Sequence, residues 1–167
     1  MKIQAVRVKE LRELSGAGVM ECRNVLVETE GNEKEALRIL KERNLMQVQK
    51  KSERATKQGV IEAYIHAGGN IGAIVELNCE TDFVARTPEF KELAHHVAMQ
   101  VAAMSPEYVS EDEIPEGTDV KPQVACLLLQ SDIRCPDMTV QDVINEVIGK
   151  LRENIKINQF ARFELGS

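Results

Sequence analysis

The fold is decided by the segment Ile61-Glu62-Ala63-Tyr64-Ile65-His66-Ala67-Gly68-Gly69-Asn70-Ile71-Gly72-Ala73-Ile74-Val75-Glu76-Leu77-Asn78-Cys79. On each side of Gly68-Gly69-Asn70, apolar residues recur at every second position, which is the side-chain period of a β-strand. Glycine and asparagine between two such runs favour a turn. The segment therefore predicts a β-hairpin.

Downstream of this hairpin the period becomes helical. Thr87 and Pro88 are typical of an N-cap and a first helical position, and Ser105-Pro106 marks the end of that helix. Thr139 predicts the cap of a second amphipathic helix, and residues 155–165 alternate again as a strand. This pattern indicates the α+β class, with an antiparallel sheet covered by helices on one face. The helix that starts at Thr87 carries one apolar stripe, formed by Phe90, Leu93, Ala94, Val97, Ala98, Val101 and Ala102.

Between these two helices the signals are weaker. Residues 108–123 are rich in acidic residues, proline and glycine, and predict a loop. Residues 124–129 form a short apolar run, which we interpret as a buried strand or the start of one.

Upstream of the hairpin, residues 6–45 predict three short helices separated by Gly16-Ala17-Gly18 and by Gly31. The first helix is expected to bury Val8, Leu11 and Leu14, and the third to begin at an Asn32 N-cap and to bury Ala36, Leu37 and Leu40. The basic stretch 46–58 is interpreted as a solvated linker or a poorly packed helix. The predicted domains are thus residues 1–45, a linker at 46–58, and an α+β domain at 59–167.

Composition argues against several classes of function. The chain of 167 residues has a formal net charge of −6, which argues against a protein built to grip nucleic-acid phosphates. It lacks the ~20-residue apolar run of a membrane span and the apolar centre of a secretory signal, so we expect a cytoplasmic protein without membrane contact. Its four cysteines are scattered and are expected to be reduced.

The sequence contains no catalytic or ligand-binding motif. His66, His95 and His96 lack a sequence-level nucleophile partner, and no glycine-rich phosphate loop is present. No enzyme activity, cofactor or metal site is therefore predicted. Thr81-Asp82-Phe83-Val84 has two interpretations: a capped turn with Phe83 in the core, or a displayed contact. Val19 and Met20, directly after the glycine turn, are likewise core or contact residues.

Three segments resemble the elongation factor Ts family, in order along the chain. Residues 8–22 resemble its N-terminal signature, residues 76–85 its second and more specific signature, and residues 160–166 the end of its short members. The resemblance implies an N-terminal three-helix bundle of the ubiquitin-associated type. It also implies a core domain that contains an antiparallel sheet.

The resemblance further implies a guanine-nucleotide exchange factor that binds elongation factor Tu·GDP, disturbs its Mg²⁺ site and holds the nucleotide-free state until GTP enters. Thr81, Asp82, Phe83 and Val84 would act at that Mg²⁺ site, with Phe83 as a wedge between helices. Val19, Met20 and Arg23 would form a second contact. Val19 and Arg23 stand where many members carry Met and Lys, and the loop 109–123 is shorter than in typical short members.

Because the core motif occurs once, the sheet has an unpaired edge, and we predict a homodimer. The main alternative function is an adaptor that binds through its N-terminal bundle without exchange activity. A thiol- or His-dependent enzyme is the more distant alternative.

Overall fold

The predicted hairpin forms two of the three strands of the sheet in the computed structural model, which describes residues 4–167. Strand β1 (Gln58–Ile65) lies antiparallel to β2 (Ile71–Cys79), and the turn between them has Gly68 and Gly69 at φ values of 95° and 72°. Glycine tolerates these positive φ values because it has no Cβ. Strand β3 (Ile155–Glu164) pairs antiparallel with the other edge of β2, so the order is β1-β2-β3. The hairpin, the C-terminal strand and the α+β class are confirmed.

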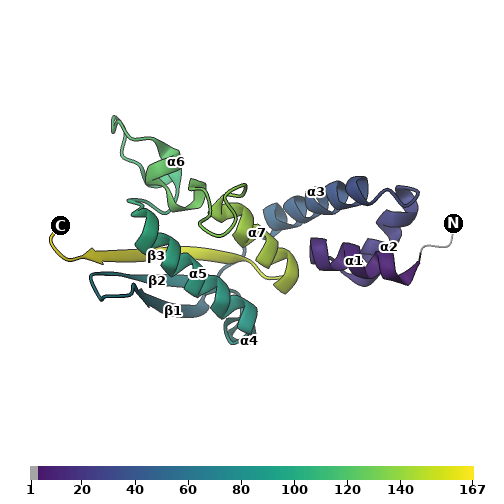
Figure 1. Ribbon diagram of the computed structural model, residues 1–167, viewed down its shortest axis with the longest axis horizontal. Coiled ribbons are helices and arrows are strands. Elements are labelled where there is room, and N and C mark those ends of the chain that lie inside the picture. Colours follow the sequence, from purple (N-terminus) through teal and green to yellow (C-terminus); the bar gives the residue numbers. More distant parts are fainter. Residues whose placement is uncertain (1–3) are drawn as a thin grey trace.

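Helix α5 (Pro88–Met104) covers one face of this sheet (Figure 1). It begins as predicted, because the Thr87 hydroxyl oxygen accepts the Phe90 backbone N–H at 3.3 Å. Helix α7 (Val140–Leu151) also begins as predicted, with Thr139 and Asp142 forming a reciprocal capping box. Helices α5 and α7 bury their apolar stripes against the sheet residues Ala73, Val75, Leu77, Ile155 and Ile157 in one core.

The opposite face of the sheet is open to solvent. In β1, Val60 and Tyr64 pack toward the core, so Ile61, Ala63 and Ile65 point the other way. Ile61 is 75% exposed, and Phe163 on β3 is 67% exposed. Register places Ala63 opposite Ile74, and Ile74 opposite Ala161, so the open face is apolar across all three strands at this level, whereas one pleat further along β2 Glu76 lies opposite Gln159.

The N-terminal part is a three-helix bundle of α1 (Ala5–Ser15), α2 (Val19–Glu28) and α3 (Glu33–Lys51), with its own core. Residues 1–3 of the predicted N-terminal domain lie outside the described residues. The Asn32 cap is confirmed, since its side chain accepts the Glu35 backbone N–H at 3.2 Å. The prediction for Leu14 is wrong: its side chain is 68% exposed. Steps of three residues drift around a helix of 3.6 residues per turn, so Leu14 leaves the face that Val8 and Leu11 share.

Helix α3 continues six residues beyond the predicted end of the bundle at residue 45, through Lys51. The linker interpretation of 46–58 is therefore wrong for residues 46–51, where the helical alternative holds. The reason is tertiary: Val48 packs against the core of the sheet domain, and Lys51 is buried. Burial, followed by the nearby charge of Arg152, lowers the pKa of Lys51.

The segment between α5 and α7 projects from the sheet domain as a lobe (Figure 1), and its Val109 and Leu127 join the core of that domain. It contains the 3₁₀ turn η1 (Glu111–Glu113), the short helix α6 (Pro122–Ala125) and a second 3₁₀ turn, η2 (Leu127–Leu129). The run 124–129 does not form a sheet strand: it is divided between α6 and η2, and Cys126 between them forms an isolated parallel bridge with Tyr108. Along residues 4–167, no helix is both long and apolar enough to cross a membrane.

Candidate partner-binding surfaces

The Thr81–Val84 segment forms a capped turn that displays one aromatic side chain. Thr81 caps the single-turn helix α4 (Asp82–Ala85), and its hydroxyl oxygen accepts the Val84 backbone N–H at 3.4 Å. Ala85 is buried and Val84 packs against the core, whereas Phe83 is 78% exposed. The core interpretation of Phe83 is therefore wrong, and this side chain is available for contact.

Asp82 lies beside Phe83 on the same turn. Its carboxylate pairs with the Arg86 guanidinium at 2.8 Å, and both side chains are largely exposed. Exposed ion pairs of this kind contribute only about 0–1 kcal/mol, so Asp82 can exchange Arg86 for another polar group at little cost.

Glu153, from the connection between α7 and β3, holds this turn in place and was missed by sequence reasoning. One oxygen of its carboxylate accepts the backbone N–H groups of Glu80 at 3.2 Å and of Thr81 at 3.0 Å. The other accepts the Thr81 hydroxyl at 2.6 Å. No local pattern signals a pair 72 residues apart in sequence. Figure 1 shows that α4 lies at the end of the sheet nearest the bundle.

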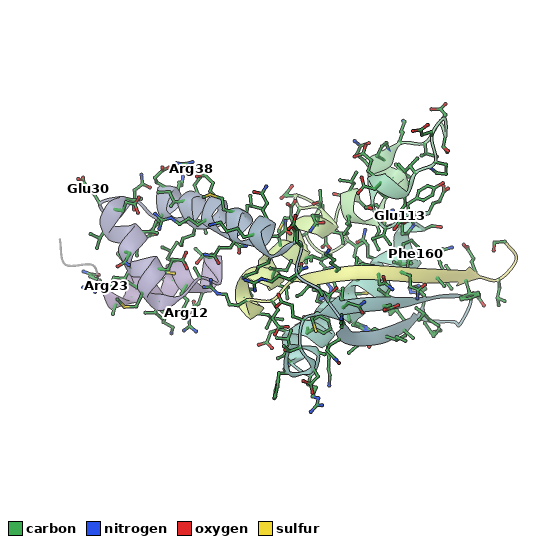
Figure 2. All side chains as sticks on the ribbon, turned by 180° about the vertical axis from the view of Figure 1, so that it is seen from behind. Arg12, Arg23, Glu30, Arg38, Glu113 and Phe160 are labelled. Atoms are coloured by element: carbon green, nitrogen blue, oxygen red, sulfur yellow. The ribbon has the colours of Figure 1, made fainter. Side chains whose placement is uncertain are left out.

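The second predicted contact lies at the start of α2. Val19 and Arg23 are exposed, and Met20 is 61% exposed, because Gly18 ends the preceding turn at the surface of the bundle. Val19 and Arg23 line a groove between α1 and α2 together with Val8 and Arg12. Arg12 and Arg23 both lie on the bundle, away from the sheet (Figure 2). The groove therefore combines an apolar floor with cationic sides.

The structure thus gathers the predicted site residues into two surfaces, which we name by their residues. The α4 surface is Thr81, Asp82, Phe83 and Val84, and the α2 surface is Val19, Met20 and Arg23. They belong to different parts of the fold and are not one site.

The histidines are engaged in structural pairs. His66 Nδ1 lies 3.0 Å from the Tyr64 hydroxyl, and His95 Nδ1 lies 3.0 Å from a Glu62 carboxylate oxygen. His96 Nε2 lies 2.8 Å from an Asp132 oxygen, although the ring N–H is not aligned for a hydrogen bond. Burial lowers the pKa of His96 and outweighs the opposing effect of Asp132.

The thiols are free, and Cys22, Cys79 and Cys126 are buried whereas Cys135 is exposed. Burial raises the pKa of Cys79 to about 11 and also raises that of Cys126, the opposite of what a nucleophilic thiolate needs. Within residues 4–167, no group of three or more His, Cys, Asp or Glu side chains is placed to hold a metal ion.

Two exposed surfaces, each with apolar and charged side chains, on a small α+β scaffold are typical of the class of proteins that bind another macromolecule through their surface. Residues 6–123 match the family model described as elongation factor TS. The chain belongs to the elongation factor Ts family.

Proteins named elongation factor Ts are similar over nearly the whole chain. That of Caldanaerobacter subterraneus subsp. tengcongensis is 43% identical, over 98% of this chain and 97% of that protein. That of Heliobacterium modesticaldum is 42% identical over 98% and 90%, and that of Thermotoga neapolitana 41% over 99% and 98%. Each match runs over 194 positions although the chain has 167 residues, so these relatives contain residues without a counterpart here.

Proposed function

We propose that this protein is a guanine-nucleotide exchange factor that binds elongation factor Tu·GDP in the cytoplasm and promotes release of GDP. The observation that carries the proposal is the exposure of Phe83, 78%, on a turn whose base is tied to the core. A large exposed aromatic side chain on a rigid turn is suited to insertion into a partner. Membership of the elongation factor Ts family supports elongation factor Tu as the partner.

In the proposed mechanism, Phe83 enters between helices of the partner's GTP-binding domain, beside the Mg²⁺ site. Asp82 leaves its exposed pair with Arg86 and engages polar groups there. Mg²⁺ demands near-octahedral geometry, so a small displacement of its ligands weakens GDP binding strongly.

No covalent bond is made or broken in this mechanism. The factor and the nucleotide each lower the partner's affinity for the other, and this coupling is reciprocal. The factor then holds the empty state until GTP binds. The partner is therefore engaged both with GDP and without nucleotide, and the chain itself contacts neither nucleic acid nor membrane.

The α2 surface supplies the second contact in this proposal. Its apolar Val19 and Met20 beside the cationic Arg23 suit an amphipathic helix with an acidic edge. We retain the division into an N-terminal domain at 1–45 and a core domain at 59–167, joined through α3, because each part has its own buried cluster.

We further propose a homodimer, formed through the open face of the sheet. That face exposes Ile61, Ile65, Ile74 and Phe163. Two copies related by a two-fold axis would cover both faces at once, as two sheets pack in a sandwich. This contact would cover the exposed apolar side chains of the open face, whereas pairing through a strand edge, the arrangement expected from sequence, would leave them exposed.

Release of a fluorescent GDP analogue from elongation factor Tu tests the proposed function. Wild-type factor at micromolar concentration should accelerate release, and Phe83→Ala should do so much less. Val124→Ala is the matched control, since Val124 is exposed on the α6 lobe, away from both surfaces. Binding to elongation factor Tu without any acceleration would instead support the adaptor alternative.

A further inference from the structure

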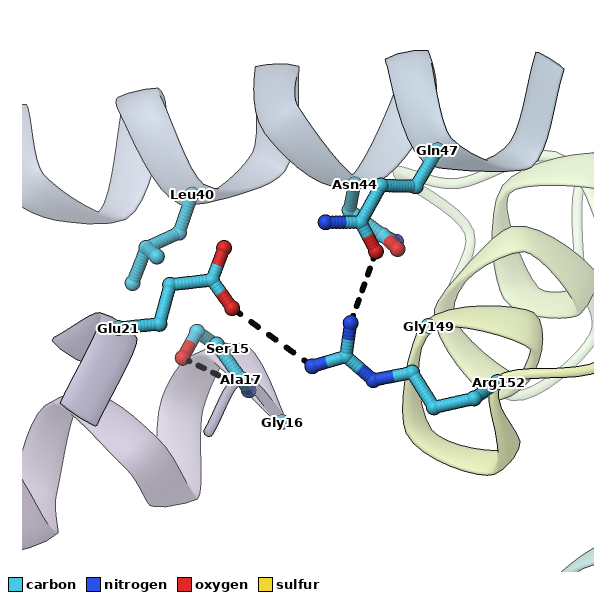
Figure 3. A pocket seen from close by; sticks show the side chains of 9 residues that line it. All are labelled: Ser15, Gly16, Ala17, Glu21, Leu40, Asn44, Gln47, Gly149 and Arg152. Atoms are coloured by element: carbon cyan, nitrogen blue, oxygen red, sulfur yellow. Dashed lines mark hydrogen bonds and ion pairs between the residues drawn. The ribbon is translucent and has the colours of Figure 1, made fainter. Parts of the chain in front are cut away.

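Two consecutive residues after α7 contact the elements that carry the two candidate surfaces: Arg152 contacts helix α2, and Glu153 contacts the turn of α4. Arg152 reaches the bundle: its Nη1 donates to Gln47 Oε1 on α3 at 2.8 Å, and its Nη2 lies 3.6 Å from Glu21 Oε2 on α2 (Figure 3). Glu21 directly follows Met20 of the α2 surface. Arg152 therefore connects the core domain to the helix that carries that surface.

Glu153 makes the corresponding connection to the α4 surface through its bonds to Thr81. Asn154, buried beside it, completes the junction. Its backbone N–H donates to Glu80 Oε1 at 2.7 Å, and its side-chain amide donates to the Arg54 carbonyl at 2.9 Å, just beyond α3. Residues 152–154 thus contact the α2 helix, the end of α3 and the start of α4.

Arg152 adopts a backbone conformation that is unfavourable for a residue with a Cβ. It is the C-cap of α7 in a left-handed conformation, with φ 65° and ψ 13°. Glycine is the usual residue there because a Cβ destabilises this conformation. The end of the helix alone gives no reason for arginine, whereas the contacts to Gln47 and Glu21 do.

Gly149, one turn earlier in α7, lies close to helix α3 of the bundle. A Cβ at this position would lie 2.4 Å from Asn44 Oδ1 on α3. Glycine within a helix is unfavourable, but here it lets Asn44 approach α7 and donate to the Asn145 carbonyl at 3.1 Å. The last turn of α7 is therefore shaped to the second half of α3.

We propose that residues 149–154 are a positioning element, which holds the α2 and α4 surfaces at a fixed separation so that both engage one partner molecule together. This inference rests on the proposed function. A rigid connection raises the effective concentration of the second contact once the first has formed, and a loose one forfeits that gain. Arg152 and Gly149 touch no partner in this arrangement and act only through placement.

The Arg152→Gly variant tests the placement of the two surfaces without destabilising the fold. It relieves the left-handed conformation and removes both side-chain contacts, so the melting temperature should not fall. Affinity for elongation factor Tu·GDP should weaken by about five- to tenfold. Ser105→Gly is the matched control, because Ser105 is the left-handed C-cap of α5 and is remote from the junction.

A double mutant tests whether the effect runs through the α2 surface. In a Met20→Ala background, where that contact is already weakened, Arg152→Gly should change affinity by less than about twofold. An unaltered penalty in this background would contradict a positioning role. Wild type that fails to bind would refute the proposed function, whereas wild type that binds no better than Arg152→Gly would refute this inference alone.

A measurement without the partner completes the test. Spin labels on the exposed Cys135 and on Lys34→Cys report the distance between core and bundle, because the remaining cysteines are buried. The distance distribution should be narrow in the wild type and in Ser105→Gly, and broader in Arg152→Gly. Equal widths in all three proteins would overturn the inference.

Discussion

Glu153 and Thr81 are joined by two hydrogen bonds, from the Thr81 N–H at 3.0 Å and from its hydroxyl at 2.6 Å, both to the Glu153 carboxylate. The pair ties the start of α4 to the connection that follows α7. The exposure of Phe83 is consequently imposed by the core, not by an unanchored loop.

Glu153→Ala should reduce nucleotide release and moderately destabilise the fold. Its loss leaves the partly buried N–H groups of Glu80 and Thr81 without their acceptor, a defect that costs about 1–3 kcal/mol. Thermal unfolding and the release assay should be run side by side with Glu146→Ala, a glutamate on α7 without a bond to the α4 turn. Full release activity in Glu153→Ala would show that the turn holds its shape unaided.

Phe83→Ala should slow nucleotide release markedly and leave the melting temperature nearly unchanged, since little of this side chain is buried. Phe90→Ala is the contrasting variant. Phe90, in the first turn of α5, is fully buried, and its loss should cost about 3–5 kcal/mol of stability. A large drop in the melting temperature of Phe83→Ala would contradict the conclusion that the Phe83 side chain is exposed.

Deleting residues 1–45 should leave residues 46–167 folded, with weaker association with the partner. Val48 and Lys51 stay in place in this truncation and continue to cover α7. Deleting residues 1–57 should lower the melting temperature, because it also removes the carbonyls of Ser52 and Arg54 that accept the buried Asn154 amide. Circular dichroism melts of both truncations check this, and equal stability of the two would argue against a structural role for the end of α3.

Phe163→Glu should convert the proposed homodimer into a monomer, because a dimer through the open face would bury this carboxylate in an apolar contact. Sedimentation equilibrium measures the change, with an unaltered circular dichroism spectrum as evidence of folding. Leu14→Glu is the matched control, since Leu14 is equally exposed but lies on the bundle. A dimer that survives Phe163→Glu would favour pairing through a strand edge.

His96 should make the protein less stable in mild acid. Its pKa is lowered in the folded state, and the charged groups that face it are Asp132, Arg134 and Glu92. Below the unfolded-state pKa of about 6.5, His96 is protonated in the unfolded chain but still neutral in the folded one. The free energy of unfolding therefore falls as the pH drops toward the folded pKa. Above the unfolded-state pKa of about 6.5, the stabilisation by neutral His96 is fully present. Melting temperatures from pH 7.5 to 5 should fall more steeply in the wild type than in His96→Gln.

Several elements followed from sequence because their causes are local. The hairpin at Gly68-Gly69, the caps at Asn32, Thr87 and Thr139, and the stripe of α5 are set by residues within a few positions of one another. The same local reasoning failed for Leu14, where a step of three residues drifts off the buried face.

The errors at 46–51 and 124–129 came from interactions that a local pattern does not contain. Residues 46–51 are mostly polar, yet they are helical because Val48 packs against the core domain and Lys51 is buried. At 124–129, the Leu127 N–H donates to the Tyr108 carbonyl at 2.9 Å and the Leu128 N–H to the Val109 carbonyl at 3.1 Å, so the apolar run pairs with a distant segment in an isolated bridge and not with a strand of the sheet.

The sequence by itself determined the fold class and the family, since these depend on local periodicity and on motifs, and the family resemblance suggested the residues of both candidate surfaces. Only the tertiary structure decided that Phe83 is exposed and that β1 turns Ile61 away from the core. It alone also joined Arg152 to the bundle and Glu153 to Thr81. Burial and hydrogen bonding between residues far apart in the chain depend on how the elements pack, and the pattern within any one element does not contain that information.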